Sequence, residues 1–150
     1  MHRRIGGRVS LTVLAIALLA LAGAAGCGSS DDDNTPTEPS SSSVTEVFTD
    51  TLTLNGAKTH TFTVTASGQI TALLLEWLPD PELRVGMSLG TWNGSLCQVV
   101  IDHPAAFRGQ VTSGYTNATG DFCVRIYDAN GTIVTPQTYT IEVSYFKASQ

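Results

Sequence analysis

The sequence has few basic residues and few cysteines, and each shortage excludes a class of function. Its 150 residues contain eight Lys and Arg against 13 Asp and Glu, which gives a formal net charge of -5. Binding to nucleic-acid phosphates requires clustered Lys and Arg, so we expect no nucleic-acid partner. The three cysteines form no C-x-x-C pattern, and a structural zinc site usually needs four ligands. We therefore expect no metal and no other cofactor.

The first 26 residues have the layout of a secretory signal peptide. Arg3, Arg4 and Arg8 supply positive charge, and an apolar run follows at residues 13–25 and ends on small side chains. This run is short for a membrane span with such flanks. An uncleaved anchor helix is the alternative, but the pattern predicts a cleaved signal peptide over residues 1–26.

The stretch Ala24-Ala25-Gly26-Cys27 resembles the lipobox of bacterial lipoproteins. In that family the cysteine thiol receives a diacylglyceryl group, the signal peptide is cut before the cysteine, and the new amino group is usually acylated. The usual lipobox has Leu where this chain has Ala24, and alanine is tolerated there. The resemblance implies that Cys27 is lipidated and that the protein is exported and anchored to the inner or outer membrane of a bacterial cell envelope. Two or more acyl chains give stable anchoring, whereas one chain does not.

Residues 27–44 are expected to form a disordered tether. They hold four acidic residues and no basic residue, together with two prolines and a serine run: Asp31, Asp32, Asp33, Glu38, Pro36, Pro39 and Ser40–Ser43. Such a segment has nothing apolar to bury, and its charge and prolines favour extension. A cation site is the alternative, but flexible carboxylates chelate poorly without a formed loop. Cleavage before Cys27 removes three of the eight basic residues and no acidic one, so five bases face 13 acids and the net charge becomes -8.

Residues 45–150 alternate polar and apolar side chains in short runs, which is typical of antiparallel sheet with one buried face. No segment of this part has a sustained helical period, and Gly, Pro, Asn and Asp separate the runs. The expected strands are 46–54, 58–66, 69–77, 84–91, 96–102, 106–112, 121–128 and 139–146. About eight short strands predict one all-β domain, an antiparallel β-sandwich that is either jelly-roll-like or Ig-like. Periodicity does not choose between the two.

The order of the strand motifs carries a family resemblance. The chain reads TFTV, SGQITALLLEW, LRVGMSLGTWNGSLC, GDFCVRIYDANG and TYTIEVSYF across residues 46–146. This order resembles the bacterial pre-peptidase C-terminal domain, which is found beside secreted peptidases and in envelope proteins. The resemblance implies a jelly-roll-like β-sandwich with an accessory role. That family often has several aspartates before a Leu-x-Leu strand, where this chain has only PDPELRVGMSL, so the resemblance gives no basis for expecting a calcium site here.

Cys97 and Cys123 are an even pair in a chain that we expect to be exported. A disulfide is the usual state of such a pair in an oxidising compartment. A metal pair and a catalytic thiol are the alternatives.

Several short motifs invite a catalytic or metal-binding interpretation. The sequence around Ser88 matches G-x-S-x-G, in which a strand–turn–helix presents a nucleophilic serine, but no helix is expected after it. His103 is the only downstream histidine, and its neighbour Asp102 is poorly placed to orient it. His60 falls on the apolar phase of its strand and is expected to pack in the core. Asp128 begins a segment like the start of a calcium loop, but the later ligands are missing, so we expect a hairpin turn and no catalytic residues.

Four aromatic residues lie near expected strand ends: Trp77, Trp92, Phe107 and Tyr115. They could stack on sugar rings or cap the sandwich. We therefore predict a non-catalytic binding or accessory module, with an envelope protein or a glycan as partner, and Trp77, Trp92 and Tyr115 as candidate ligand-binding residues. A carbohydrate-binding or adhesive surface module is the second hypothesis, and a small serine hydrolase that uses Ser88 is the third.

Overall fold

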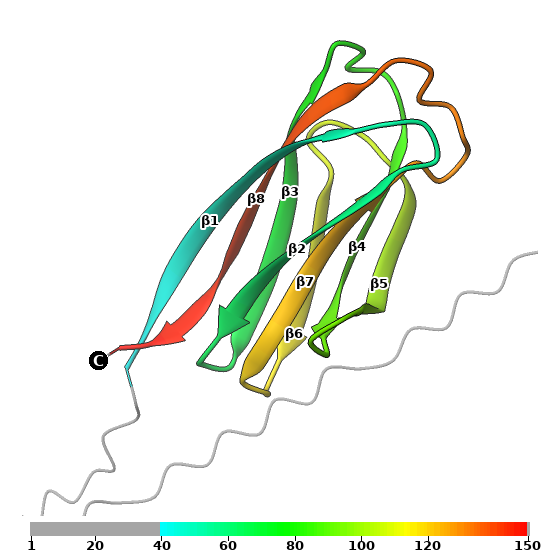
Figure 1. Cartoon of the computed structure of the whole chain (residues 1–150). Coiled ribbons are helices and arrows are strands. Elements are labelled where there is room, and N and C mark those ends of the chain that lie inside the picture. Colours follow the sequence, from blue (N-terminus) through cyan, green and yellow to red (C-terminus); the bar gives the residue numbers. More distant parts are fainter. Residues whose placement is uncertain (1–39, 150) are drawn as a thin grey trace, which may run out of the picture. The chain divides into compact units, whose positions relative to one another are not determined.

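The computed structural model describes residues 40–149, which form two four-stranded antiparallel sheets packed face to face (Figure 1). The strands are β1 (Ser41–Leu52), β2 (Ala57–Val64), β3 (Gly68–Leu78), β4 (Val85–Trp92), β5 (Cys97–Ala106), β6 (Val111–Thr116), β7 (Gly120–Tyr127) and β8 (Gln137–Ala148). One sheet has the order β1-β8-β3-β6, and the other has the order β2-β7-β4-β5. The predicted all-β sandwich is confirmed. Since residues 40–149 contain no helix, this part of the chain offers no apolar helix that could span a membrane.

The strands pair in a nested order that identifies the topology. β1 pairs with β8, β2 with β7, β3 with β6 and β4 with β5. Each connection crosses from one sheet to the other except the β4–β5 hairpin. Eight strands rolled up in this way form a jelly roll. The Ig-like alternative is excluded, because that fold groups its strands differently between the sheets.

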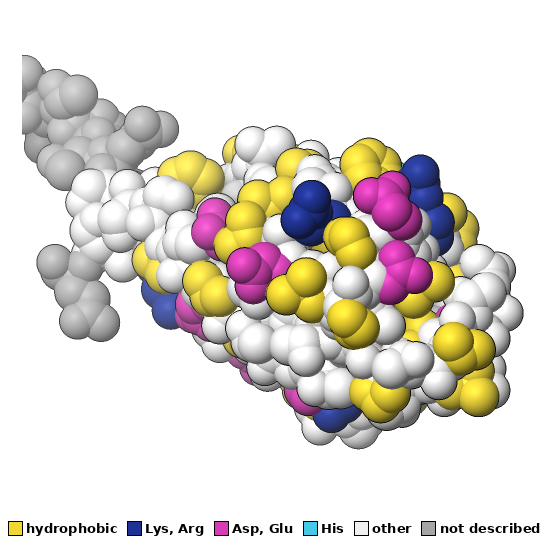
Figure 2. Space-filling model, turned by 90° about the horizontal axis from the view of Figure 1, so that it is seen from above, with side chains coloured by type: hydrophobic (Ala, Val, Ile, Leu, Met, Phe, Trp, Pro, Cys, Tyr) yellow, Lys and Arg dark blue, Asp and Glu magenta, His cyan; other side chains and the backbone are white. Residues whose placement is uncertain are grey.

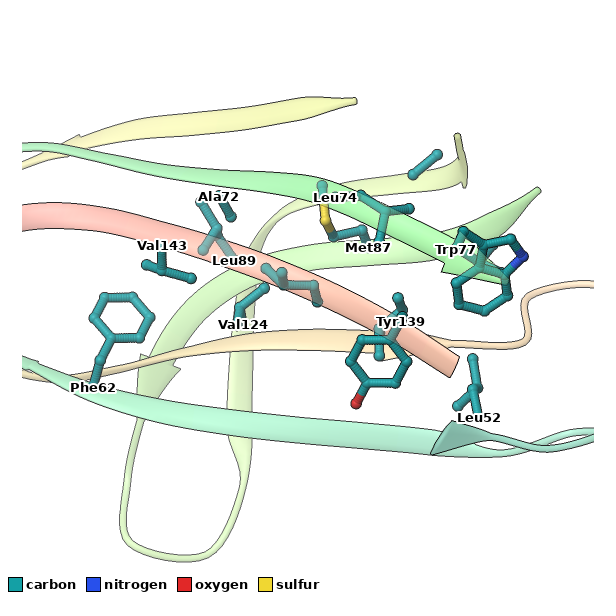
Figure 3. Close-up of a cluster of buried hydrophobic side chains, with 14 of the residues drawn as sticks. Leu52, Phe62, Ala72, Leu74, Trp77, Met87, Leu89, Val124, Tyr139 and Val143 are labelled. Atoms are coloured by element: carbon teal, nitrogen blue, oxygen red, sulfur yellow. The ribbon is translucent and has the colours of Figure 1, made fainter. Parts of the chain in front are cut away.

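The core lies between the two sheets and is built from the inward-facing phase of each strand (Figure 3). Met87 and Leu89 face inward from β4, and Val124 faces inward from β7. Burial of each such side chain contributes about 1.5–3 kcal/mol. Trp77 is fully buried, and its ring stacks on that of Tyr139 with the centroids 6.2 Å apart. The prediction that Trp77 contacts a ligand is therefore wrong, because the β3 pleat turns its indole into the core.

Two predicted boundaries differ from the structure. β1 begins at Ser41 rather than at residue 46, because Ser41–Val44 pair with Tyr145–Ala148, so the last residues of the predicted tether (27–44) belong to this strand. The strand predicted at 106–112 is instead the end of β5, a turn and the start of β6, since the Gln110 N–H donates to the Phe107 carbonyl and Gly109 has a φ of 90°. The predicted signal peptide (1–26), Cys27 and the rest of the tether up to residue 39 lie outside the described residues.

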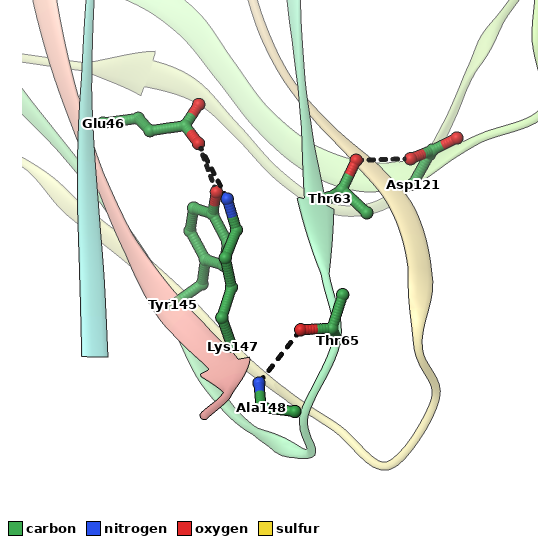
Figure 4. A network of polar contacts seen from close by, with 7 residues as sticks. All are labelled: Glu46, Thr63, Thr65, Asp121, Tyr145, Lys147 and Ala148. Atoms are coloured by element: carbon green, nitrogen blue, oxygen red, sulfur yellow. Dashed lines mark hydrogen bonds and ion pairs between the residues drawn. The ribbon is translucent and has the colours of Figure 1, made fainter. Parts of the chain in front are cut away.

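Polar contacts fasten the end of the domain where β1 begins and β8 ends (Figure 4). The Tyr145 hydroxyl donates to Glu46, and Lys147 Nζ lies 3.6 Å from the same carboxylate. The backbone N–H of Ala148 donates to Thr65 Oγ1 at 2.9 Å, which links β8 to the segment after β2 in the other sheet. These contacts hold β1 in place at the end through which any tether enters the domain.

Candidate binding surface around strand β5

The predicted disulfide is confirmed, and it joins two strands that are not neighbours. Cys97 begins β5 and Cys123 lies in β7, while β4 runs between these two strands. Neighbouring strands lie about 4.8 Å apart, so a flat sheet would separate these two by roughly 10 Å. The Cα atoms of Cys97 and Cys123 are only 5.8 Å apart. The start of β5 therefore curls over the outer face of β4.

Gly90 makes this curl possible. A Cβ atom at Gly90 would lie 2.1 Å from the carbonyl oxygen of Gln98, so only glycine fits beneath the β5 backbone. A register shift between Leu89 and Gly90 marks a β-bulge at the same place, and bulges increase the local bend of a sheet. As a result Cys123 is fully buried although it lies on the outward phase of β7.

An apolar cleft of about 210 Å³ lies between β5 and β6, which are the edge strands of the two sheets on this side. Its apolar lining comprises Ile70, Leu89, Val100, Ile101, Tyr115 and Phe122. Gly114 contributes space, because a Cβ there would lie 2.8 Å from Ile101 Cδ1.

Exposed hydrophobic side chains lie along β5 and beside it, and two of them, Val100 and Tyr115, line the cleft. The exposed fraction is 73% for Val100, 72% for Tyr115, 67% for Leu96 and 46% for Val99. We call these four residues the β5 surface. Grouped exposed apolar side chains mark interaction sites on soluble domains, so this surface is the principal candidate for binding a partner.

The edge of β5 is poorly suited to pairing with another strand. Its ladder with β4 shifts register twice, between Val85 and Met87 and between Leu89 and Gly90, and it contains Pro104. Bulges and proline are devices that stop an edge strand from adding a further strand. This edge therefore offers a partner its side chains rather than a backbone ladder for strand addition.

A second hollow, of about 270 Å³, lies beneath the β4–β5 hairpin. Its lining residues are Thr59, Trp92, Ser95, Leu96, Cys97 and Arg125. It is more polar than the first cleft, since both spaces are lined by two Ser or Thr side chains but only this hollow also has a guanidinium. The structure thus places Trp92 in this hollow and Tyr115 in the cleft, on two sides of β5.

The guanidinium of Arg125 packs on the aromatic ring of Tyr127. Its central carbon lies 4.7 Å from the centroid of the Tyr127 ring. The Tyr127 hydroxyl donates to both carboxylate oxygens of Asp102, at 2.9 and 3.0 Å. Burial raises the pKa of Tyr127, and the hydrogen bond to Asp102 raises that pKa further, so the phenol stays protonated and keeps donating.

Ser88 is fully buried in the middle of β4, and its hydroxyl has no hydrogen-bond partner among the described residues. β4 continues past it as a strand, so the strand–turn–helix that G-x-S-x-G chemistry requires is not formed. In the β4–β5 ladder Ser88 faces Asp102, whereas His103 faces Met87 on the opposite phase. The interpretation of Ser88 as a hydrolytic nucleophile is therefore wrong.

His60 is packed as expected. Its Nε2 lies 2.8 Å from the Tyr139 hydroxyl oxygen, and its ring stacks on Phe48 with the centroids 4.8 Å apart. Burial lowers the pKa of His60, which favours the neutral imidazole.

The segment that begins at Asp128 is not a hairpin turn, because β7 and β8 belong to different sheets. The Asp128 carboxylate accepts backbone N–H groups from Asn55, Thr132 and Ile133 at 3.0, 3.0 and 3.3 Å. Although burial favours the neutral acid, these hydrogen bonds lower the pKa of Asp128. The carboxylate therefore organises the crossover loop. Among residues 40–149, no three His, Cys, Asp or Glu side chains gather as a metal site would require.

The opposite end of the domain has a mixed surface. Figure 2 shows this end from above, with hydrophobic side chains separated by acidic and basic ones. Leu54, Leu78, Phe107 and Val134 are exposed there in four different loops or strand ends, and the Arg84 guanidinium covers Phe107 at 4.8 Å. Phe107 therefore packs against its own domain here.

Sequence reasoning missed Leu96, Val100 and Arg125 as surface residues. The run Cys97-Gln98-Val99-Val100-Ile101 has three consecutive apolar residues at its end, and this break in the alternation was a signal of the bulge that turns Val100 outward. Arg125 follows the polar phase of β7, but the sequence does not show that the hairpin would close over it.

Comparisons with known proteins give little further guidance. No family model matches the chain, and no curated protein matches it significantly. Solved structures that match include Aeromonas hydrophila PliG, a periplasmic lysozyme inhibitor of g-type lysozyme, at 11% sequence identity. The match covers 71% of this chain and 86% of that one, with a TM-score of 0.42. A TM-score of 0.42 is too low to carry an inference about this chain.

Proposed function

We propose that the protein is a lipid-anchored module of the bacterial cell envelope whose jelly-roll domain binds a partner and catalyses no reaction. The observation that carries this proposal is the β5 surface. It comprises four exposed apolar side chains, two of which line an apolar cleft of about 210 Å³. An envelope protein is the partner that such a surface favours, because apolar contact area is the main source of protein–protein affinity.

The disulfide and the N-terminal sequence support export and anchoring. Cys97 and Cys123 are joined, and structural disulfides persist in oxidising compartments such as the periplasm and the cell surface. In this proposal the lipobox-like residues before Cys27 direct lipidation of that cysteine. The acidic, serine-rich segment after it is an extended tether that separates the domain from the membrane. The resemblance to pre-peptidase C-terminal domains supports an accessory role.

The separation of the chemically reactive side chains supports binding rather than catalysis. A catalytic site needs a nucleophile or metal, a base within hydrogen-bond reach and a group that orients it. Ser88 is buried, His60 is hydrogen-bonded to Tyr139, and both domain cysteines are in the disulfide.

Glycan binding is the second candidate function. It is favoured by the hollow that places the Trp92 indole and the Arg125 guanidinium around one space. An aromatic face and a few placed polar groups are the usual components of a small-ligand site.

The anchoring part of the proposal is tested by membrane fractionation of the Cys27→Ser variant. The wild-type protein is expected in the membrane fraction with a mature N-terminus at an acylated Cys27, and the variant is expected to lose that acylation and leave the membrane. Cys97→Ser is the matched control, because it removes a different cysteine and leaves the acylation unchanged. A mature N-terminus elsewhere, without lipid, would contradict the proposal.

A further inference from the structure

We infer that the hollow beneath the β4–β5 hairpin binds a sugar ring that carries a carboxylate. The inference rests on the proposed binding function and names a ligand class for the same region of the domain.

Arg125 supplies the positive charge. Among residues 40–149 its guanidinium makes no hydrogen bond and no ion pair, whereas Lys58 and Lys147 each pair with a carboxylate. Asp102, on the neighbouring part of the same face, is occupied by the Tyr127 hydroxyl. The planar guanidinium presents paired N–H donors that match a carboxylate in a bidentate geometry. Stacking on the Tyr127 ring restrains the orientation of that plane.

The apolar wall and the hydroxyl groups suit a sugar ring. Trp92 and Leu96 come from the hairpin, and Thr59 and Ser95 bring hydroxyl groups to the same space. The Ser95 hydroxyl donates to Asn93 Oδ1 at 3.1 Å, so its oxygen lone pairs remain to accept a hydrogen bond from a ligand. The C–H face of a pyranose can pack on an indole while its hydroxyl groups reach the polar side of the hollow.

The size and charge of the hollow further restrict which ligands fit it. At about 270 Å³ it lies just below the usual range for drug-sized ligands, so it suits one ring rather than a long segment. One guanidinium balances one carboxylate. A phosphate would bring more negative charge into an acidic protein with a single cation in the hollow.

The test is calorimetric titration of the full-length lipoprotein in detergent with three probes. Trigalacturonic acid presents uronic carboxylates, an N-acetylmuramic acid disaccharide presents the carboxylate of a cell-wall sugar, and fully methyl-esterified trigalacturonate keeps the rings but removes the charge. We expect binding of at least one acidic probe and none of the ester. Which acidic probe binds distinguishes the two sources of the carboxylate.

Variants assign the binding to the hollow. Arg125→Gln and Trp92→Ala are each expected to lower the affinity for the acidic probe by about tenfold or more, as loss of a hydrogen-bonded charge pair or a stacked ring predicts. Arg125→Lys keeps the positive charge but loses the paired N–H donors, so its affinity is expected to lie between those of wild type and Arg125→Gln. Arg108→Gln is the matched control, since it removes an exposed arginine from the β5–β6 turn, and no change is expected. Thermal unfolding checks that each variant is folded.

Two results would overturn the inference. The first is equal binding of the acid and its ester, unaffected by Arg125→Gln. The second is the absence of binding to both acidic probes by the folded wild-type protein. If the acidic probes fail while an envelope protein binds through the β5 surface, the inference is wrong and the proposed function stands.

Discussion

The Nε2 atom of His60 lies 2.8 Å from the hydroxyl oxygen of Tyr139, and this hydrogen bond joins the two sheets of the sandwich. His60 comes from β2 and Tyr139 from β8. Phe48 of β1 stacks on the imidazole and shields it. The histidine therefore fastens the side of the jelly roll opposite the β5 surface, where β1 and β2 are the edge strands.

Stability is expected to fall in mild acid because of His60. Burial lowers its pKa below the ordinary value of 6.5, with Asp50 opposing and Lys58 adding to that shift. The unfolded chain then binds more protons than the folded one, so stability is lost as the pH drops from about 6.5 towards the folded-state pKa. Urea unfolding at several pH values should show this slope in wild type and a smaller slope in His60→Phe.

The pKa of Asp50 is lowered first by its hydrogen bond with Lys58, and backbone hydrogen bonds lower the pKa of Asp128. These two carboxyl groups affect stability only as the pH falls below about 5. Measurements above about pH 5 therefore isolate the histidine. An identical slope in wild type and His60→Phe over that range would contradict the assignment.

Loss of the disulfide is expected to destabilise the domain by about 3–4 kcal/mol, the chain-entropy value for a loop of this length. Cys97 and Cys123 are separated by 26 residues. The Cys97→Ala/Cys123→Ala variant should unfold at a lower urea concentration than wild type and should not respond to reductant. A variant as stable as the oxidised wild type would show that the link across β4 is unimportant.

Gly86→Ala is expected to disturb the support of Arg125. A Cβ at Gly86 would lie 2.1 Å from Cζ of the Tyr127 ring, so the ring must move and its hydrogen bonds to Asp102 must weaken. Overpacking of this kind costs typically about 1–3 kcal/mol. In Tyr127→Ala the same glycine change should cost much less, because the clash is gone.

Gly114→Ala is the matched control for that experiment. Its new Cβ would meet only the end of the Ile101 side chain, at 2.8 Å, and that end can turn aside. The coupling between Gly86 and Tyr127 is measured by urea unfolding of wild type, Gly86→Ala, Tyr127→Ala and the double variant. Equal costs of Gly86→Ala with and without the ring would contradict the contact.

Ser88→Ala is expected to leave the protein folded and to raise or preserve its stability, by up to about 1 kcal/mol. The reason is that the change removes a buried hydroxyl with no partner among the described residues. Thermal unfolding measures the change, and a panel of esterase and peptidase substrates tests for any activity. Turnover by wild type that disappears in Ser88→Ala would contradict the assignment of Ser88 to the strand interior.

Strand periodicity predicted most of the fold, because polar and apolar side chains alternate along β2 and along most of β7 and β8, where Cys123 and Thr140 are buried exceptions on the outward phase. It could not predict the jelly-roll topology, since strand pairing between β1 and β8 depends on contacts about a hundred residues apart. The β5–β6 boundary was misplaced because a glycine predicts a break in a strand wherever it occurs in the sequence. Gly109 does lie in the turn between the two strands, but Gly114 lies inside β6.

The candidate site was predicted only in part. Trp92 and Tyr115 were singled out as aromatics near loops, but this criterion also selected Trp77, which the pleat of β3 buries. The two hollows exist because Gly90 lets the hairpin fold over β4. That close approach is a three-dimensional event, so neither Arg125 nor Val100 could be assigned to a binding surface from their neighbours in sequence.

The most direct test of binding through the β5 surface compares Val100→Asp with Val47→Asp in a titration of solubilised envelope proteins against the immobilised full-length lipoprotein. Both valines are exposed on edge strands, Val100 on β5 and Val47 on β1. With both variants folded, Val100→Asp is expected to weaken binding by about tenfold or more, because a charge would enter an apolar contact, and Val47→Asp should bind as wild type does. Equal binding by wild type and Val100→Asp, or an equal loss in Val47→Asp, would contradict binding through this surface.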